Sequence, residues 1–73
     1  MSLFITTDLV LFPQPQLGIV EESILPNQPG YIRFQGTYWQ AKLHHHEDTS
    51  ILQSGAMVNV LGRDGLILLV EAH

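Results

Sequence analysis

The side chains in this sequence that most readily bind a metal ion stand in a run of three histidines followed by two acidic residues. On an extended strand successive side chains point to opposite faces, so only His44 and His46 could share one ion. Glu47 or Asp48 could add a carboxylate oxygen and complete a two-histidine, one-carboxylate set. A structural zinc site normally has four ligands, and the terminal His73 is the one further candidate. We therefore expect a solvated strand end or loop, with no bound metal.

Other catalytic arrangements do not fit the sequence. No serine stands in a Gly-x-Ser-x-Gly elbow, and the chain has no cysteine to act as a nucleophile or zinc ligand. Glu21 and Glu22 are adjacent on a predicted strand, so they should point to opposite faces and not work as an acid–base pair. The segment 62–65 is too short for a phosphate-binding or dinucleotide-binding loop. We expect a protein with no catalytic activity and no cofactor.

Tyrosines and basic residues form a better candidate for binding. On two strands predicted over 31–35 and 37–44, alternation places on one outer face Tyr31, Arg33, Tyr38, Gln40 and Lys42. Arg63, the third basic residue, falls in a later loop. Aromatic rings beside cations can stack bases and contact phosphates in single-stranded nucleic acid. The same residues also make good exposed cross-strand pairs.

The overall charge favours a protein partner over nucleic acid. Seven acidic residues against three basic ones give a formal net charge of −4. Nucleic-acid and anionic-membrane binding both rely on clustered lysine and arginine. We therefore predict protein binding, and the alternative is single-stranded nucleic-acid binding through the tyrosine-bearing face. The length of 73 residues allows one small domain, whose core must hold the fold without disulfides.

Short strands separated by glycine and proline turns make up most of the chain. The predicted strands are 17–25, 31–35, 37–44, 57–61 and 66–71. Gln35 and Gly36 suit a two-residue hairpin turn with glycine at positive φ, and 63–65 suits a three-residue loop. This spacing predicts an all-β fold, a small five-stranded OB-like barrel whose neighbouring strands all run antiparallel.

The first 16 residues are predicted to be an N-terminal extension. Residues 3–12 are mostly apolar and favour an extended strand, and 13–16 should form a stiff linker because its two prolines forbid a helix. The apolar run is about half the length of a membrane span and lacks the basic region of a signal peptide. We therefore predict an extension and proline-rich linker over 1–16 and the barrel domain over 17–73.

The alternation of side chains between the two faces of each predicted strand predicts the core of the barrel. The side chains expected to point inward are Ile32, Phe34, Trp39, Ala41, Val58, Val60, Leu68 and Val70. The loop at 63–65 would pair Val60 with Leu68 and Val58 with Val70. Trp39 is thus expected to pack inside the barrel and not to anchor an interface.

The same alternation places several apolar side chains on the outer surface of the barrel. Ile67 and Leu69 should face outward, and with Met57 and Leu61 they would form an apolar patch. We expect residues 3–12 to cover this patch, within one chain or across a homodimer, and the alternative cover is a foreign partner. The candidate interaction surface therefore comprises Tyr31, Arg33, Tyr38, Lys42, Arg63, Ile67 and Leu69.

From Gly18 onward the chain resembles the C-terminal soluble domain of NfeD-like proteins. The matching positions are Gly18, Leu25, Pro26, Gly30, Ile32, Phe34, Gly36, Trp39, Ala41, Ile51, Gly55, Val58, Val60, Gly65, Leu68 and Val70. They follow the family's order of an opening glycine, a leucine–proline turn, a glycine hairpin and two paired strands. The turn from Pro26 to Gly30 is longer than the family's usual proline-x-glycine turn.

This resemblance implies a fold and a partner. The fold is the five-stranded OB-like barrel, acting as a non-catalytic protein–protein interaction module. The implied partner is a stomatin- or flotillin-like membrane scaffold protein, and homo-oligomers are compatible with it. Because no membrane-spanning run precedes the domain in this sequence, we expect a cytoplasmic protein that reaches the membrane surface through its partner.

Overall fold

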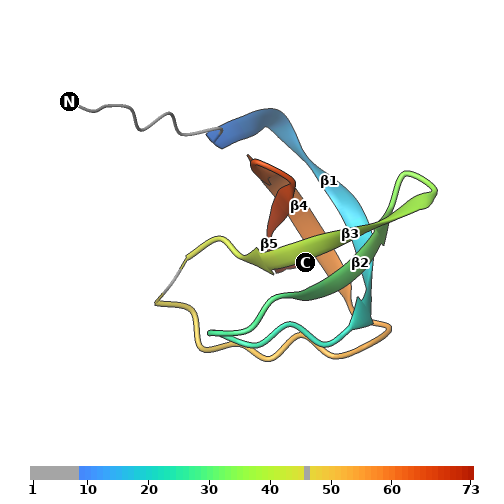
Figure 1. The fold of residues 1–73 in the computed structure, drawn as a ribbon, viewed down its shortest axis with the longest axis vertical. Helices are drawn as coiled ribbons and strands as arrows, with labels where there is room; N and C mark the ends of the chain where they lie inside the picture. Colours follow the sequence, from blue (N-terminus) through green and yellow to red (C-terminus); the bar gives the residue numbers. More distant parts are fainter. Residues whose placement is uncertain (1–8, 46) are drawn as a thin grey trace.

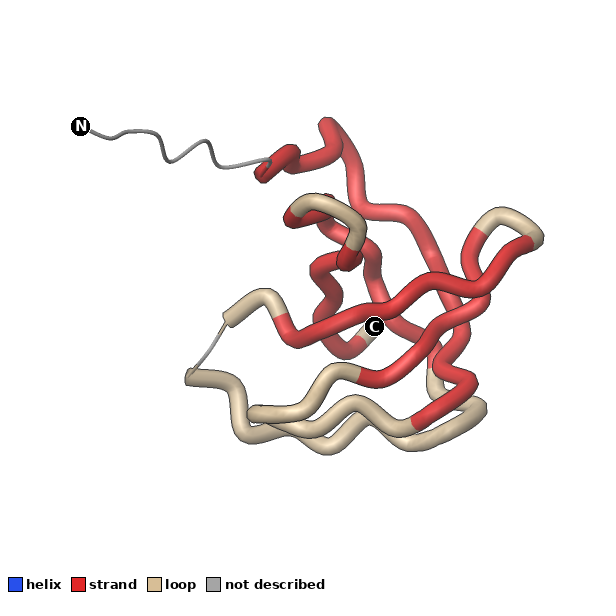
Figure 2. Tube along the Cα trace, in the orientation of Figure 1, coloured by secondary structure: helices blue, strands red, loops and turns tan. Residues whose placement is uncertain are grey.

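The computed structural model describes residues 9–45 and 47–73, which form strands, turns and loops with no helix among them (Figures 1 and 2). Five strands follow one another along the chain. They are β1 (Leu9–Glu22), β2 (Gly30–Phe34), β3 (Thr37–Leu43), β4 (Met57–Asp64) and β5 (Ile67–Ala72). Within the described residues no helix is long and apolar enough to cross a membrane.

The strands close into one barrel in the order β1-β2-β3-β5-β4, which confirms the predicted five-stranded OB-like barrel. The expectation that all neighbours run antiparallel is wrong at one seam, because β3 and β5 are parallel. The chain between β3 and β4 crosses the bottom of the barrel in Figure 1, so β4 pairs with β1 and β5 closes against β3. The alternation of apolar and polar residues within a strand does not indicate which strands become neighbours in the sheet.

Two tight turns shape the hairpins. Gln35 and Gly36 both have positive φ, at 53° and 82°, as a two-residue type I′ turn requires. At the other hairpin Gly65 has φ 63°, and Asp64 pairs directly with Ile67. The second connection is therefore a two-residue turn, shorter than the predicted three-residue loop.

A bulge in β4 changes the predicted pairing of the last hairpin. Val60 lies opposite Val70 and Val58 lies opposite Ala72, so the expected pairs of Val60 with Leu68 and Val58 with Val70 are wrong. The register shifts between Val60 and Gly62, where the bulge adds one residue to β4. The shorter turn moves the pairing by three residues and the bulge moves it back by one. The net displacement is two residues, an even number, so the side chains keep the predicted faces.

β1 begins earlier than predicted and continues through the expected linker. Residues 9–11 pair with the end of β4, and pairing resumes at Gln16, which lies opposite Val60. Between Leu11–Gly62 and Gln16–Val60, four residues of β1 lie opposite one residue of β4. The two prolines fall within this irregular stretch, where the missing N–H groups interrupt no regular ladder. The described part of the extension therefore joins the barrel as strand.

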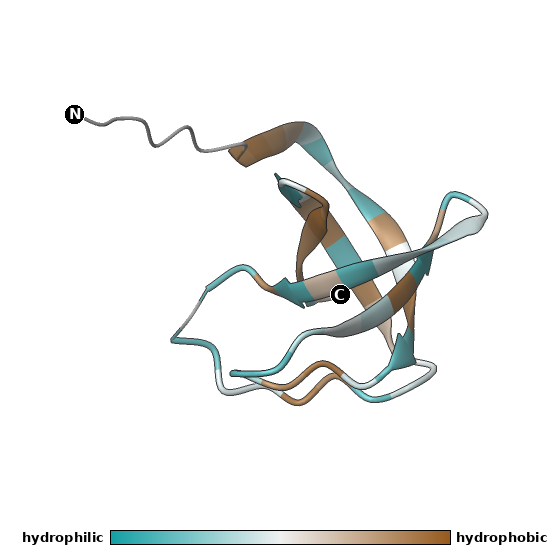
Figure 3. Cartoon of the chain, in the orientation of Figure 1, coloured by the Kyte–Doolittle hydropathy of each residue, from teal (hydrophilic) through white to brown (hydrophobic). Residues whose placement is uncertain are grey.

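The core lies inside the barrel, where apolar side chains from all five strands and the connecting loops meet. The buried cluster comprises Val20, Ile24, Ile32, Phe34, Ala41, Leu43, Leu52, Val58, Val60, Leu68 and Val70. Along several strands hydrophobic and hydrophilic residues alternate, whereas the start of β1 is continuously hydrophobic (Figure 3). Trp39, expected inside, is half-buried and packs against this cluster together with Phe12.

Leu69 departs from the expected outer patch, because only 3% of it is exposed. It lies opposite Gly62, and paired residues point to the same face of a sheet. A Cβ added to Gly62 would overlap the carbonyl oxygen of Val10 and come within 2.8 Å of the Leu11 Cα. The start of β1 thus passes over the side of β4 to which Leu69 points. This segment covers the Leu69 side chain and shields it from solvent.

Candidate functional site

A row of exposed side chains crosses four strands on the outside of the barrel. Ile19 of β1 lies between Met57 of β4 and Arg33 of β2, and Arg33 lies opposite Tyr38 of β3. These positions share one face because directly paired residues point the same way. Leu17 joins the row along β1, since Gly18 between them packs inward against Ile32 and Val60. We call this set, with Tyr31, the outer face: Leu17, Ile19, Tyr31, Arg33, Tyr38 and Met57.

The outer face is rich in apolar surface. Ile19 is 44% exposed, Leu17 51%, Met57 46% and Tyr38 63%. Exposed apolar patches with a polar rim mark interaction surfaces, and tyrosine, methionine and arginine are enriched in such interfaces. The arrangement suits contact with a folded protein surface.

Sequence reasoning missed two members of this face. The sequence predicts a strand over 17–25 but assigns no face to Leu17 and Ile19. The signal lay in the alternation with Gly18 and Val20, of which Val20 is 1% exposed. With Val20 pointing inward, strand alternation places Leu17 and Ile19 on the outward face of the same strand.

The predicted interaction surface separates into two regions. Tyr31, Arg33 and Tyr38 lie together on the outer face, with Arg33 opposite Tyr38 as expected. Lys42 lies four residues beyond Tyr38 on β3, which is about 13 Å along a strand. Ile67 is half-buried at the β4–β5 turn, and Leu69 is buried.

The three basic side chains do not gather into one cationic surface. The Lys42 ammonium is 3.1 Å from a carboxylate oxygen of Asp64. The Arg63 guanidinium donates a hydrogen bond of 3.0 Å to the Gly65 carbonyl. Only Arg33 lies among the tyrosines, so this face does not offer the row of phosphate contacts that nucleic-acid binding needs.

A pocket of about 430 Å³ opens at one end of the outer face, lined by Glu21, Glu22, Tyr31 and Tyr38. The two adjacent glutamates were expected on opposite faces of β1. That expectation is wrong because the pairing of β1 with β2 shifts between Val20 and Glu22. The bulge places both glutamates in the lining of the same pocket, and both are exposed.

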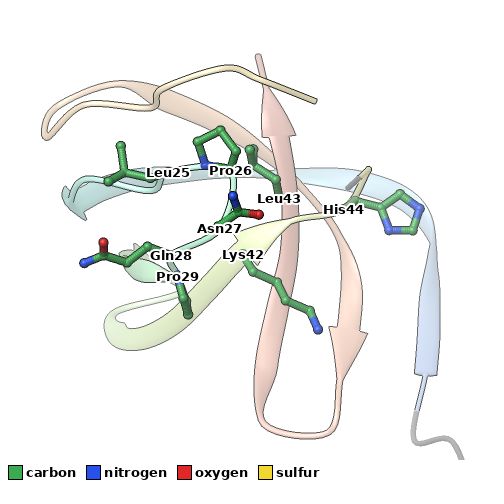
Figure 4. Close-up of a pocket in the computed structure, with 8 residues that line it drawn as sticks. All are labelled: Leu25, Pro26, Asn27, Gln28, Pro29, Lys42, Leu43 and His44. Carbon is green, nitrogen blue, oxygen red and sulfur yellow. The ribbon is translucent and has the colours of Figure 1, made fainter. Parts of the chain in front are cut away.

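A second pocket of about 360 Å³ lies between the loop after β1 and the end of β3. Its lining residues are Leu25, Pro26, Asn27, Gln28, Pro29, Lys42, Leu43 and His44 (Figure 4). The charged group of this lining, the Lys42 ammonium, already pairs with Asp64. The other polar groups that line this pocket do not indicate a particular ligand.

The histidine run shows no metal centre in the described residues. No group of three potential ligands comes together there, and His46 lies outside those residues. The His44 and His45 rings lie 4.7 Å apart, tilted by 57°. His73 Nδ1 is 3.0 Å from Asn59 Oδ1, so this ring has a partner elsewhere.

Asp48 belongs to a local turn. Hydrogen bonds from the Ser50 side chain and backbone lower its pKa, with a smaller contribution from the charge of His45. The Ser50 amide donates to Asp48 Oδ1 at 2.8 Å. This hydrogen bond stabilises the local turn and occupies one oxygen of the carboxylate.

Comparison with known proteins places this geometry in context. The family model described as "NfeD-like C-terminal, partner-binding domain" matches residues 16–71. A solved structure, the C-terminal domain of stomatin operon partner protein 1510-C from Pyrococcus horikoshii, is similar with a TM-score of 0.67 and 28% sequence identity. The similarity covers 82% of this chain and 86% of that chain. A search of curated proteins finds no match.

Proposed function

Because this chain belongs to the NfeD-like family, as a C-terminal, partner-binding domain, we propose that it binds a stomatin-like protein through the outer face of its barrel. The similar archaeal domain comes from a stomatin operon partner protein, which supports this class of partner. The proposed role is non-catalytic, which the description of the family as a partner-binding domain supports.

The observation that carries the proposal is the exposed apolar row around Ile19. Met57, Ile19 and Tyr38 lie on three different strands, yet the barrel aligns them with Arg33 into one surface. Burying such side chains against a partner is favourable by about 25 cal/mol for each Å² of apolar surface removed from water. Two basic residues that would have favoured nucleic acid have other partners: Lys42 pairs with Asp64, and Arg63 donates to the Gly65 carbonyl.

The proposal extends to domain limits and location. Residues 17–73 form the partner-binding domain and residues 1–16 an extension, although β1 crosses this boundary as a continuous strand. A stomatin-like membrane scaffold protein would bring the domain to the cytoplasmic membrane surface, and a flotillin-like protein is the related alternative.

The test compares two exposed isoleucines. The stomatin-like protein from the same source is titrated against the full chain, its Ile19→Glu variant and its Ile51→Glu variant. Ile51 is 60% exposed in the loop between β3 and β4, does not belong to the outer face, and is the matched control. We expect Ile19→Glu to weaken binding at least tenfold and Ile51→Glu to leave it unchanged. Unchanged binding by Ile19→Glu, with its barrel intact by circular dichroism, would rule out this face.

A further inference from the structure

The pocket at the end of the outer face is lined by both acidic and aromatic residues. Two acidic residues, Glu21 and Glu22, and two exposed aromatic residues, Tyr31 and Tyr38, line it. Glu22 lies opposite Tyr31 in the β1–β2 pairing. Tyr31 and Tyr38 are diagonal neighbours across β2 and β3, since Tyr31 lies opposite Gln40. Diagonal pairs are close enough for aromatic side chains to share one space.

The two glutamates of this pocket form no ion pair within the described residues. Among residues 9–45 and 47–73, the ion pair within 4.0 Å is Lys42 with Asp64, and neither glutamate takes part in one. Arg33 is the nearest basic residue along β2, but the described residues include no ion pair from it to Glu21 or Glu22. Two carboxylates therefore face solvent beside two aromatic rings.

We propose that this pocket receives an arginine side chain of the partner protein. A guanidinium is planar, stacks on aromatic rings and presents a fork of N–H donors to carboxylates. Lysine offers a point charge without the planar face, so it fits the two rings less well. An anionic ligand would meet the repulsion of both glutamates. The bulge in β1 is what makes the site, because a regular strand would turn one of the carboxylates away.

This inference rests on the proposed function, since it names what the partner presents next to the apolar row. The pocket shares Tyr31 and Tyr38 with the outer face. An arginine in the pocket would therefore orient the partner while apolar side chains cover Ile19 and Met57. Charged contacts at an interface act mainly on specificity and association rate, and the apolar row supplies the desolvated area.

The first experiment tests the pocket without any partner. The ¹⁵N-labelled full chain is titrated with N-acetyl-arginine amide, and in parallel with N-acetyl-citrulline amide, which has nearly the same shape but no charge. We expect saturable amide shifts at Glu21, Glu22, Tyr31 and Tyr38 at millimolar concentrations of the arginine compound. The citrulline compound should cause none, and N-acetyl-lysine amide should bind more weakly. Equal shifts with citrulline, or shifts centred elsewhere, would overturn the proposal.

The second experiment uses the partner and a charge-matched control. Glu21→Gln/Glu22→Gln removes two negative charges at the pocket, and Glu47→Gln/Glu71→Gln removes two elsewhere. We expect the first variant to lose at least tenfold in affinity for the stomatin-like protein and to lose the arginine shifts, while the second retains both. An equal loss of affinity in the two variants would show that the effect comes from the net charge of the chain, and it would contradict the proposal. Arginine binding without partner binding would instead contradict the proposed function and leave the pocket assignment standing.

Discussion

Gly62 of β4 lies so close to Val10 of β1 that any side chain at position 62 would overlap the Val10 carbonyl oxygen. Figure 1 shows the consequence, in which the start of β1 lies beside the tip of the β4–β5 hairpin. Residues 9–11 pair with residues 62–64 of β4, so the N-terminal end of this long strand depends on a glycine near the opposite end of the chain. The close approach also covers Leu69.

The first prediction follows from this contact. Gly62→Ala is expected to destabilise the full chain by about 1–3 kcal/mol, because overpacking forces backbone shifts of that cost. In a chain lacking residues 1–12 the same substitution should be nearly neutral, because the Val10 carbonyl is gone. Urea denaturation of the four proteins in this cycle gives the coupling free energy. Equal costs in both backgrounds would show that Gly62 is needed for another reason.

The second prediction concerns the extension itself. Deleting residues 1–12 removes the pairing of Leu9–Leu11 with β4 and the contact of Phe12 with the core. We expect a loss of about 2 kcal/mol, comparable to exposing one large apolar side chain. The uncovered edge of β4 should also promote self-association, which analytical ultracentrifugation detects. A truncated chain that stays monomeric and equally stable would contradict this role.

The third prediction distinguishes Leu69 from its exposed neighbour. Leu69→Ala is expected to cost about 2–5 kcal/mol, the range for buried leucines. Leu66, 82% exposed at the same hairpin, serves as the control and should change the free energy of unfolding by less than about 0.5 kcal/mol on substitution by alanine. Similar small effects at both positions would mean that Leu69 is accessible to solvent.

The fourth prediction concerns Trp39, whose indole N–H is buried without a hydrogen-bond partner among the described residues. Trp39→Ala should cost about 3 kcal/mol, the lower end for aromatic truncation, because the ring is only half-buried. Trp39→Phe should cost much less, since it keeps a ring and removes the unpaired donor. Thermal denaturation checks both. If phenylalanine proves as costly as alanine, the indole N–H makes a bond that matters.

The fifth prediction concerns metal ions. Stoichiometric zinc or nickel is expected to leave the melting temperature unchanged, because His44 is not joined by two further ligands in the described part of the chain. Differential scanning fluorimetry with and without chelator measures this. A rise in melting temperature that disappears in His44→Ala would restore the metal site.

The sequence alone determined most of the inward-facing residues of the barrel. Ile32 and Phe34 alternate with polar residues on β2, and both are buried, because a strand repeats its faces every two residues. The Gln35-Gly36 turn followed from local backbone preference. The cross-strand position of Arg33 opposite Tyr38 followed from that turn. Each of these depends on residues close together in the chain.

Only the tertiary structure decided the features that carry the proposals. The bulge at Glu21–Glu22, the parallel contact of β3 with β5 and the passage of β1 over Gly62 all depend on segments distant in sequence. A bulge leaves no mark in local alternation, yet it moves a carboxylate from one face to the other. Neighbour order in a closed barrel is set by how the whole sheet buries its inner face. The outer face and its acidic pocket are therefore properties of the folded chain.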